Sequence, residues 1–378
     1  MRLSYITTYD ARDVNNWSGL GYYISKALTD QGNTLDYIGN LNRKLTASTL
    51  LNAFYYRKLL KKGYPLDRDL AVVKAYADQI RKRINTDTDV LFSPGSIPMA
   101  LLEHSKPKAF YTDSTFAGIL GFYKDFSNLS AKSIRDGNYL EQKALDTADL
   151  AIYSSEWAAA SAIKDYHTDP AKVKVVPFGA NLEGTPAYEE IRSIIRKRPE
   201  TECNLLFLGV DWERKGGNLA LEIAADLNKR GLKTILHIVG IDKFPLDTQP
   251  SYVRLHGRIT KNSASGNKKI RELLEDSHFL VLPTIADCTP IVFSEANSFG
   301  LPCISTTVGG IPTIIKNGQN GQLFTLTDTP GRYADYIESL LANNAQYEEL
   351  CLASYHEFAS RLNWNTAAKT ITQFLRQL

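Results

Sequence analysis

Short, continuous apolar runs separated by longer amphipathic segments recur along the whole sequence of 378 residues. Such runs are typical of strands buried on both faces of a parallel sheet, and the segments between them are typical of covering helices. The series occurs twice and predicts two doubly wound α/β domains. The expected strands are LSYITT (3–8), TLDYIG (34–39), DVLFSP (89–94), KAFYTD (108–113), LAIYSS (150–155) and VKVVPFG (173–179), then NLLFLG (204–209), TILHIVG (234–240), VRLHG (253–257), HFLVLP (278–283) and PCISTT (302–307).

The length suits two domains better than a single core. A polar stretch at 182–202 separates the two series and is the expected linker. We therefore expect an N-terminal Rossmann-like domain at 1–182 and a C-terminal one at 183–361, followed by an amphipathic closing helix at 362–378.

Composition excludes several classes of protein. A net charge of +3 gives no reason to expect nucleic-acid binding. The four cysteines form no C-x-x-C pair and the histidines are isolated, so we expect neither a zinc site nor a disulfide framework, and a reducing cytoplasm is the expected location. No apolar run is long enough for a membrane span, and the first residues enter a strand-like pattern, unlike a signal peptide.

The stretch ADCTPIVFSEANSFGLP (286–302) places two carboxylates, Asp287 and Glu295, around the expected start of a helix. Thr289 is a good N-cap and Pro290 a good first helical residue, while Gly300 suits the position just after the helix. The free N–H groups at a helix start attract anions. A ligand with an anionic middle and hydroxyl groups on both sides, such as a nucleotide sugar, would suit this arrangement.

A second stretch, LFLGVDWERKGG (206–217), carries cations directly after an expected strand. In open α/β sheets, ligands bind outside the carboxyl ends of the strands. Arg214 and Lys215 lie there, before Gly216 and a helical segment. Their charges would stabilise a departing diphosphate.

Together these motifs resemble the retaining family-four glycosyltransferases of the GT-B fold. The family signature, two acids separated by seven residues and followed by a GLP turn, is matched by Asp287, Glu295 and SEANSFGLP, with Asp in place of the usual first Glu. The likeness covers almost the whole chain in the expected order. It includes the basic pair after FLG, VVPFGAN (175–181), VGGIP (308–312) and NGQNGQLF (317–324).

The resemblance implies roles in the second domain. Glu295 would bind the ribose of the donor, and Arg214 and Lys215 would hold its diphosphate. Asp287 would contact the transferred sugar, together with the backbone around four residues. These are Thr289, Pro290, Ile291 and Val292.

In the first domain, WSGLGYYISKAL (17–28) resembles the glycine loop that lies over the donor phosphates, which implicates Gly19. YTDSTF (111–116) lies where many members carry a His-Asp pair near the reacting sugar. Asp113 matches the Asp of that pair, while Thr112 replaces the His. Thr313, after Ile-Pro, stands where many members have Glu.

The implied activity is transfer of a hexose from a nucleotide sugar to an acceptor hydroxyl with retention of configuration. A UDP-sugar is the favoured donor, with GDP- and ADP-sugars as alternatives, and neither metal nor cofactor is expected. In the mechanism discussed for the family, the acceptor attacks on the leaving-group face and the departing phosphate takes its proton. The acceptor, a glycan, a lipid-linked molecule or a small molecule, is not encoded in any motif.

Other classes of function stay open at this stage. A non-catalytic GT-B subunit that binds a sugar nucleotide or a partner would tolerate the changes at Asp287 and Thr112. A nucleotide-sugar isomerase or epimerase would need an acid/base pair, which we do not find.

Gly19-x-Gly21 also follows a strand, but Ile24 occupies the third glycine position of a dinucleotide fingerprint. Asp87-Thr88-Asp89 precedes a strand and is expected to be a turn, not a metal-binding D-x-D.

The segment 54–84 holds nine Lys and Arg against three Asp, interleaved with Tyr and Phe. Such a segment is usually a solvated helical surface. It also suits contact with an anionic acceptor or with the anionic inner face of a membrane. Peripheral membrane contact through 54–84 is therefore a hypothesis.

Overall fold

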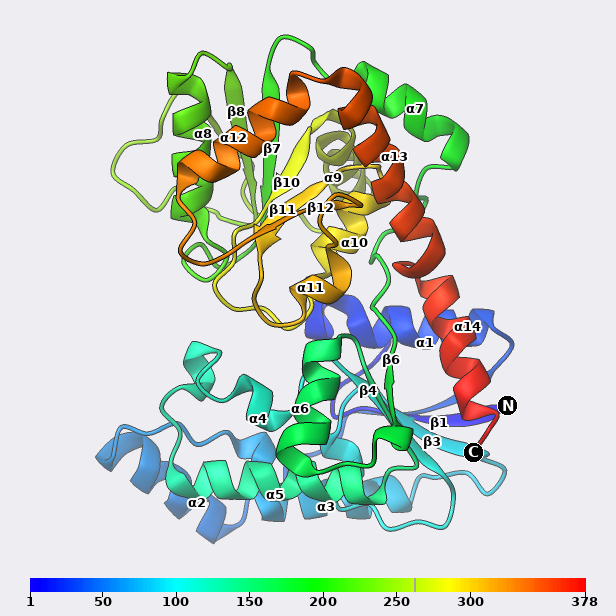
Figure 1. Cartoon of the computed structure of the whole chain (residues 1–378). Coiled ribbons are helices and arrows are strands. Elements are labelled where there is room, and N and C mark those ends of the chain that lie inside the picture. Colours follow the sequence, from blue (N-terminus) through cyan, green and yellow to red (C-terminus); the bar gives the residue numbers. More distant parts are fainter. Residues whose placement is uncertain (262) are drawn as a thin grey trace. The chain divides into compact units, whose positions relative to one another are not determined.

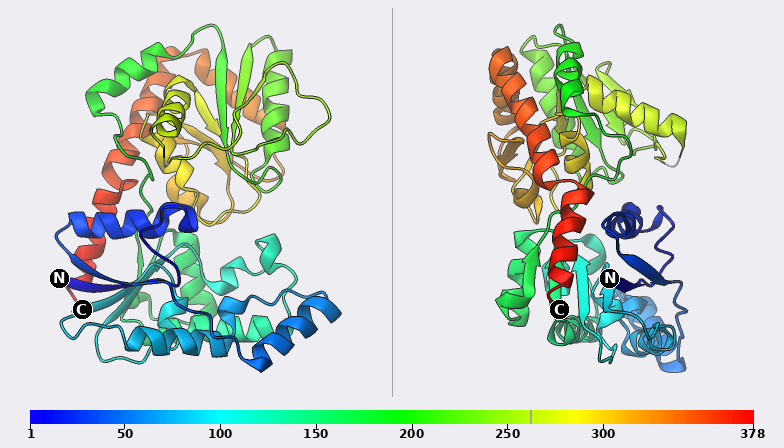
Figure 2. Two further views of the ribbon diagram at one scale, coloured as in Figure 1. Left: turned by 180° about the vertical axis from the view of Figure 1, so that it is seen from behind. Right: turned by 90° about the vertical axis from the view of Figure 1, so that its right-hand side faces the viewer.

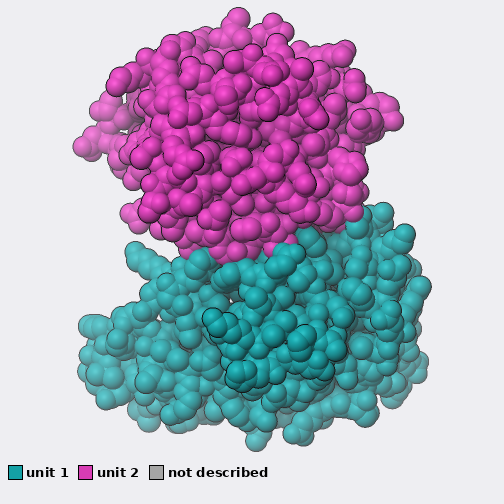
Figure 3. Space-filling model, viewed as in Figure 1, with its two compact units in different colours: residues 1–177, 364–378 teal, residues 178–363 magenta. Residues whose placement is uncertain are grey.

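The computed structural model describes residues 1–261 and 263–378 (Figure 1). The chain forms two compact units (Figure 3). Each unit has its own parallel sheet. Unit 1 comprises Met1–Pro177 and Trp364–Leu378, and unit 2 comprises Phe178–Asn363. The expected doubly wound α/β architecture is confirmed, because both sheets have six strands and all pairings within them are parallel.

The sheet of unit 1 has the strand order β2-β1-β3-β4-β5-β6. Helices lie on both of its faces (Figure 2). The strands are β1 (Arg2–Ile6), β2 (Thr34–Ile38), β3 (Val90–Ser93), β4 (Lys108–Thr112), β5 (Leu150–Tyr153) and β6 (Val173–Val175). The α-helices are α1 (Leu20–Asp30), α2 (Ala47–Phe54), α3 (Leu70–Arg81), α4 (Phe116–Ile119), α5 (Ala131–Thr147), α6 (Glu156–Tyr166) and α14 (Trp364–Leu375).

The last helix, α14, packs beside α1 within unit 1 (Figures 1 and 2). The amide of Asn33 donates to the Thr372 hydroxyl at 2.9 Å in a buried position, and Gln31 donates to Asn365 at 2.7 Å. The chain therefore leaves unit 1 after Pro177 and re-enters it at Trp364.

The sheet of unit 2 has the order β12-β11-β10-β7-β8-β9. Its strands are β7 (Cys203–Leu208), β8 (Thr234–Val239), β9 (Val253–Leu255), β10 (Phe279–Val281), β11 (Cys303–Thr306) and β12 (Gly321–Phe324). Its helices are α7 (Tyr188–Lys197), α8 (Gly217–Lys229), α9 (Ala264–Asp276), α10 (Ile291–Asn297), α11 (Ile311–Ile314), α12 (Pro330–Leu341) and α13 (Asn344–Arg361).

Two details of unit 2 differ from the sequence analysis. The stretch 182–202, expected as a linker, contains α7, whose residues Ile191, Ile194 and Ile195 are buried in the core of unit 2. Strand β12 was not among the expected strands, because its two central residues are only partly buried and it pairs only with β11 in the sheet. A short edge strand with this composition lacks a continuous apolar run.

The Asp87-Thr88-Asp89 segment is a turn between α3 and β3, as expected. Asp89 accepts a hydrogen bond from the Arg2 backbone N–H at 2.8 Å, and the hydroxyls of Thr88 and Ser4 lie 2.8 Å apart. These contacts attach the turn to the start of β1, so the two acids belong to the scaffold of unit 1.

The C-terminal end of α10 is held by a glycine and an arginine. Gly300 has a φ of +58°, and its N–H and that of Leu301 donate to Asn297 and Ala296, the pattern of a Schellman motif. The buried guanidinium of Arg198 donates to the carbonyl oxygens of Phe299 and Gly300 at 3.1 and 3.2 Å. The predicted role of Gly300 is thus confirmed.

We predict that Gly300→Ala lowers the free energy of unfolding by about 1–2 kcal/mol, because a Cβ is disfavoured in the left-handed region. A Cβ there would also lie 3.0 Å from the Cys351 carbonyl oxygen. Gly331→Ala in α12 is the matched control, since its Cβ would make only ordinary contacts. Urea denaturation measures both, and equal losses in the two variants would contradict the account.

Candidate active site at the carboxyl ends of β7 and β10

The loops that follow β7 and β10 are joined to each other. These strands are neighbours in parallel register, with Leu205 opposite Phe279, so both loops leave the same edge of the sheet. The carbonyl oxygen of Arg214 accepts from the Ile285 N–H at 2.9 Å and from the Thr284 hydroxyl at 2.7 Å. The backbone thereby fixes the cationic turn against the loop that leads to Asp287.

Arg214, Lys215 and Asp287 meet in one cluster. The Asp287 carboxylate, 10% exposed, is 3.2 Å from Arg214 Nη1 and also pairs with Lys215 Nζ. Arg214 additionally donates to the Ala286 carbonyl oxygen at 2.9 Å and pairs with the more exposed Asp211 at 3.4 Å. The sequence motifs indicate separate ligand groups for Asp287 and for the two cations, and in the structure these three side chains contact each other.

The two glycines after the cations are required by close packing. Gly216 has a φ of +75°, and a Cβ on it would lie 2.0 Å from the Pro283 carbonyl oxygen. A Cβ on Gly217 would lie 2.2 Å from the ring of Trp212. The turn can therefore approach the β10 loop only because both residues lack side chains.

The helix that carries Glu295 begins one residue later than expected. Pro290 is its N-cap, without a side-chain capping bond, and Ile291 is its first residue. Thr289 was expected to cap the helix, but its hydroxyl donates to the adjacent Cys288 carbonyl oxygen at 2.7 Å. Thr289 lies one residue before the N-cap, because Pro290 takes the extended N-cap conformation with a φ of −68° and a ψ of 115°.

Glu295 is the most deeply buried acid of the site, with 1% of its surface exposed. Its Oε1 pairs with Nζ of Lys261, which lies in the loop after β9. Its Oε2 has no hydrogen-bond partner among the residues that the structure describes. A buried carboxylate oxygen without a donor is costly, and a ligand hydroxyl would satisfy it.

Lys261 was not identified from the sequence. It lies in the polar loop HGRITKN, which follows an expected strand and also contains Gly257 and Arg258. A glycine and cations after a strand are a weak signal that the sequence analysis did not use, and nothing in the sequence links Lys261 to Glu295. Its role becomes visible only when the tertiary structure brings it to Glu295.

The two candidates in the first domain, Gly19 and Asp113, both lie in unit 1. Gly19 has a φ of +82° and precedes α1, and Trp17 and Ser18 before it also adopt left-handed angles of 44° and 54°. Such a run in non-glycine residues is strained and is typical of functional turns. Asp113 follows β4 directly, and the Ser114 hydroxyl donates to it at 3.4 Å.

No group of three or more His, Cys, Asp or Glu in residues 1–261 and 263–378 is arranged to hold a metal ion. No helix described there is long and apolar enough to cross a bilayer.

Comparison with known families identifies the second unit. Residues 189–356 match the family described as "Glycosyl transferases group 1". The matched segment contains Arg214, Lys215, Asp287 and Glu295, and the match agrees with the resemblance that the motifs indicate.

Two curated relatives share part of the sequence. A D-inositol 3-phosphate glycosyltransferase from Corynebacterium urealyticum is 24% identical over 267 residues, which cover 63% of this chain and 59% of the relative. One from Mycobacterium bovis is 26% identical over 208 residues, covering 53% of this chain and 42% of the relative. The chain thus spans about half the length of these relatives.

Solved structures match the whole chain at low identity. Sucrose-phosphate synthase from Thermosynechococcus elongatus has a TM-score of 0.69 at 15% identity, covering 100% of this chain and 98% of that one. Anabaena Alr3699/HepE in complex with UDP-glucose has a TM-score of 0.64 at 14% identity, covering 100% of both chains. At such identities the likeness establishes the fold, which is GT-B.

We predict that Lys261→Met destabilises the protein by about 1–3 kcal/mol, because it leaves the buried Glu295 carboxylate without its cation. Adding Glu295→Gln should recover part of the loss, since the charge is then removed. Urea unfolding of the two single variants and the double variant measures the coupling. Strictly additive losses would show that the ion pair is absent in solution.

Proposed function

We propose that the protein is a glycosyltransferase that moves a hexose from a nucleotide sugar to an acceptor hydroxyl. Two charged groups of unit 2 carry this proposal, the cluster of Arg214, Lys215 and Asp287 and the buried pair of Glu295 and Lys261. Arg214 and Lys215 offer charge to a diphosphate, and Glu295 offers a buried oxygen that lacks a donor. The family of residues 189–356 supports the same reading.

Each residue receives a role from its chemistry. The ribose hydroxyls would donate to the free Oε2 of Glu295, which Lys261 holds in place. The diphosphate would share Arg214 and Lys215 with Asp287. The second acid beside Arg214, Asp211, is 48% exposed, so solvent screens its charge more strongly. Asp287 would also accept from a hydroxyl of the hexose. The backbone of Thr289, Pro290, Ile291 and Val292 would line the sugar.

Two residues of unit 1 complete the assignment. Gly19 lies in the strained turn before α1, and it would let the backbone approach the donor phosphates. Asp113, at the carboxyl end of β4, would orient the donor or the acceptor through its carboxylate.

The transfer would proceed with retention of configuration. The acceptor oxygen would bond to the anomeric carbon from the face that the diphosphate leaves, while the bond from that carbon to the phosphate oxygen breaks. The acceptor proton would pass to the departing phosphate oxygen. Arg214 and Lys215 would stabilise the charge that develops on the leaving group, a task that other glycosyltransferases give to a metal ion. Neither metal nor cofactor is part of this proposal.

A UDP-sugar is the favoured donor, with GDP- and ADP-sugars as alternatives. The structure of HepE in complex with UDP-glucose supports this choice, because that protein has the same fold. The acceptor would be a glycan, a lipid-linked molecule or a small molecule. We place the protein in the cytoplasm, with peripheral contact to an anionic membrane through the basic segment 54–84.

We predict that Lys215→Ala and Glu295→Ala each lower transfer by roughly 10²–10³, because each removes a charge contact with the donor. Lys229→Ala, an exposed cation at the end of α8, is the matched control and should keep the wild-type rate. Transfer is measured as the nucleoside diphosphate that is released when the protein is incubated with the donor and an extract that contains acceptors. Wild-type rates in both site variants would refute the assignment.

We predict that transfer persists after dialysis against EDTA, since Arg214 and Lys215 supply the charge. The rate is measured before and after adding back Mg²⁺ or Mn²⁺. A loss that either ion restores would contradict the metal-independent mechanism. Nucleotide binding without any transfer or hydrolysis would favour the non-catalytic alternative.

A further inference from the structure

A patch of large apolar side chains is exposed on α2 and on the π-helix η2 (Tyr55–Leu59) that follows it. Leu51 and Leu59 expose 69% and 62% of their surface. We call the whole set the apolar patch: Leu45, Leu50, Leu51, Phe54, Tyr55, Leu59 and Leu60. Contiguous exposed apolar side chains of this kind mark a surface that contacts a partner or a membrane.

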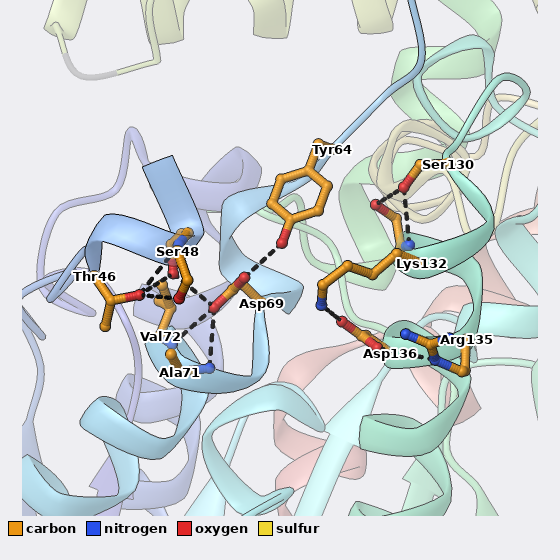
Figure 4. A network of polar contacts seen from close by, with 12 residues as sticks. Thr46, Ser48, Tyr64, Asp69, Ala71, Val72, Ser130, Lys132, Arg135 and Asp136 are labelled. Carbon is orange, nitrogen blue, oxygen red and sulfur yellow. Dashed lines mark hydrogen bonds and ion pairs between the residues drawn. The ribbon is translucent and has the colours of Figure 1, made fainter. Parts of the chain in front are cut away.

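The inner side of α2 is polar. Thr49 is its only buried residue, and its hydroxyl donates to Asp69 at 3.1 Å. Asp69 also accepts from the Tyr64 hydroxyl at 2.6 Å and from the N–H groups of Ala71 and Val72 at the start of α3 (Figure 4). The helix is thus attached by hydrogen bonds and turns its leucines outward, the reverse of a helix that packs on a core.

Cations without acids surround the apolar patch. No Asp or Glu occurs between Asp36 and Asp67. The basic residues of this stretch, all exposed, are Arg43, Lys44, Arg57, Lys58, Lys61 and Lys62. Three of the six are held by the scaffold, because Arg43 pairs with Asp67, Arg57 donates to the Tyr64 carbonyl oxygen and Lys62 donates to the Asn128 amide oxygen at 2.7 Å. The other three are Lys44, Lys58 and Lys61.

We propose that residues 44–62 form a membrane-docking surface, in which the apolar patch enters the headgroup region and the lysines contact anionic lipid phosphates. Apolar side chains beside lysines and tyrosine are what an interfacial helix needs. A second copy of the chain is a poor occupant, because two like surfaces would bring the same cations together without an acid.

The proposed surface, residues 44–62, covers fewer residues than the segment 54–84. It contacts the membrane by inserting apolar side chains as well as by charge. In α3, the apolar residues Val72, Val73, Tyr76, Ala77 and Ile80 are buried within unit 1, so that helix offers a membrane only its polar face. The inference rests on the membrane contact included in the proposed function. It does not depend on sugar transfer, because none of residues 44–62 belongs to the candidate active site.

Vesicle binding tests the surface. The full chain is sedimented with phosphatidylcholine vesicles that contain phosphatidylglycerol, and with phosphatidylcholine alone. We expect binding to the anionic vesicles. We expect L51E/F54E to weaken it about tenfold or more through lost apolar burial, and K58E/K61E to weaken it by a similar factor.

Two matched controls locate the contact. Leu246→Glu in unit 2 makes the same change at a leucine that is 48% exposed, and it should bind like wild type. K74E/K82E reverses two exposed cations of 54–84 that lie outside 44–62, and it should also bind nearly normally. An equal loss in K74E/K82E and K58E/K61E would overturn the proposed surface in favour of diffuse charge attraction.

Insertion is tested by fluorescence. The four native cysteines are buried, so Phe54→Cys provides one exposed thiol for an environment-sensitive dye. We expect a blue shift on adding anionic vesicles, and the same dye at Leu246→Cys should not shift. Three results would overturn the proposal. These are wild-type vesicle binding by L51E/F54E, no vesicle binding by the wild-type protein, and a dimer that L51E/F54E disrupts.

Thermal shifts with nucleotides are measured on the same variants. They test the proposed function separately, because they report nucleotide binding and not vesicle binding.

Discussion

The candidate active site depends on the parallel register of β7, β10 and β11. All residues of β10 are buried, and it pairs with β7 on one side and with β11 on the other. The loops that follow β7 and β10 therefore leave the sheet side by side. Only this register lets the Arg214 carbonyl accept from Ile285 and brings its guanidinium to Asp287. The glycines at 216 and 217 are a consequence, since a Cβ at 216 would meet the Pro283 carbonyl oxygen and one at 217 the ring of Trp212.

The charged groups of unit 2 are arranged as pairs. Asp287 pairs with the cations of one loop, and Glu295 with Lys261 of another, so each side chain is oriented before a ligand arrives. Because these charged side chains are already held in place, they need to move little when a charged ligand binds beside them or displaces the residue with which they pair. Arg198 fixes the far end of α10, because it binds the carbonyl oxygens that terminate the helix. The position of Glu295 is thereby determined from both ends of its helix.

The fold was predicted correctly from the sequence, while the roles of the candidate site residues stay predictions. Buried parallel strands are continuous apolar runs, and Gly300 has a conformation that few other residues adopt. Strand β12 was missed because its central residues are half-buried, and Thr289 was misassigned as a cap because the helix begins one residue later, with Pro290 as its N-cap. Lys261 could not be predicted, since its partner is distant in the sequence. The exposure of the apolar face of α2 could not be predicted either, because an apolar stripe in the sequence does not show which side of a helix packs on the core.

The most direct test of the account is hydrogen exchange of the full chain with and without UDP-glucose, GDP-mannose and ADP-glucose. Binding at the proposed site would slow exchange in the loop 209–217 and in 284–297, for one nucleotide and not the others. The same experiment with Glu295→Gln should lose this protection. Two results would contradict the claim that the carboxyl edge of the unit 2 sheet binds a nucleotide sugar. One is slower exchange only outside these two segments, to the same degree with every nucleotide. The other is no change in exchange with any of the three.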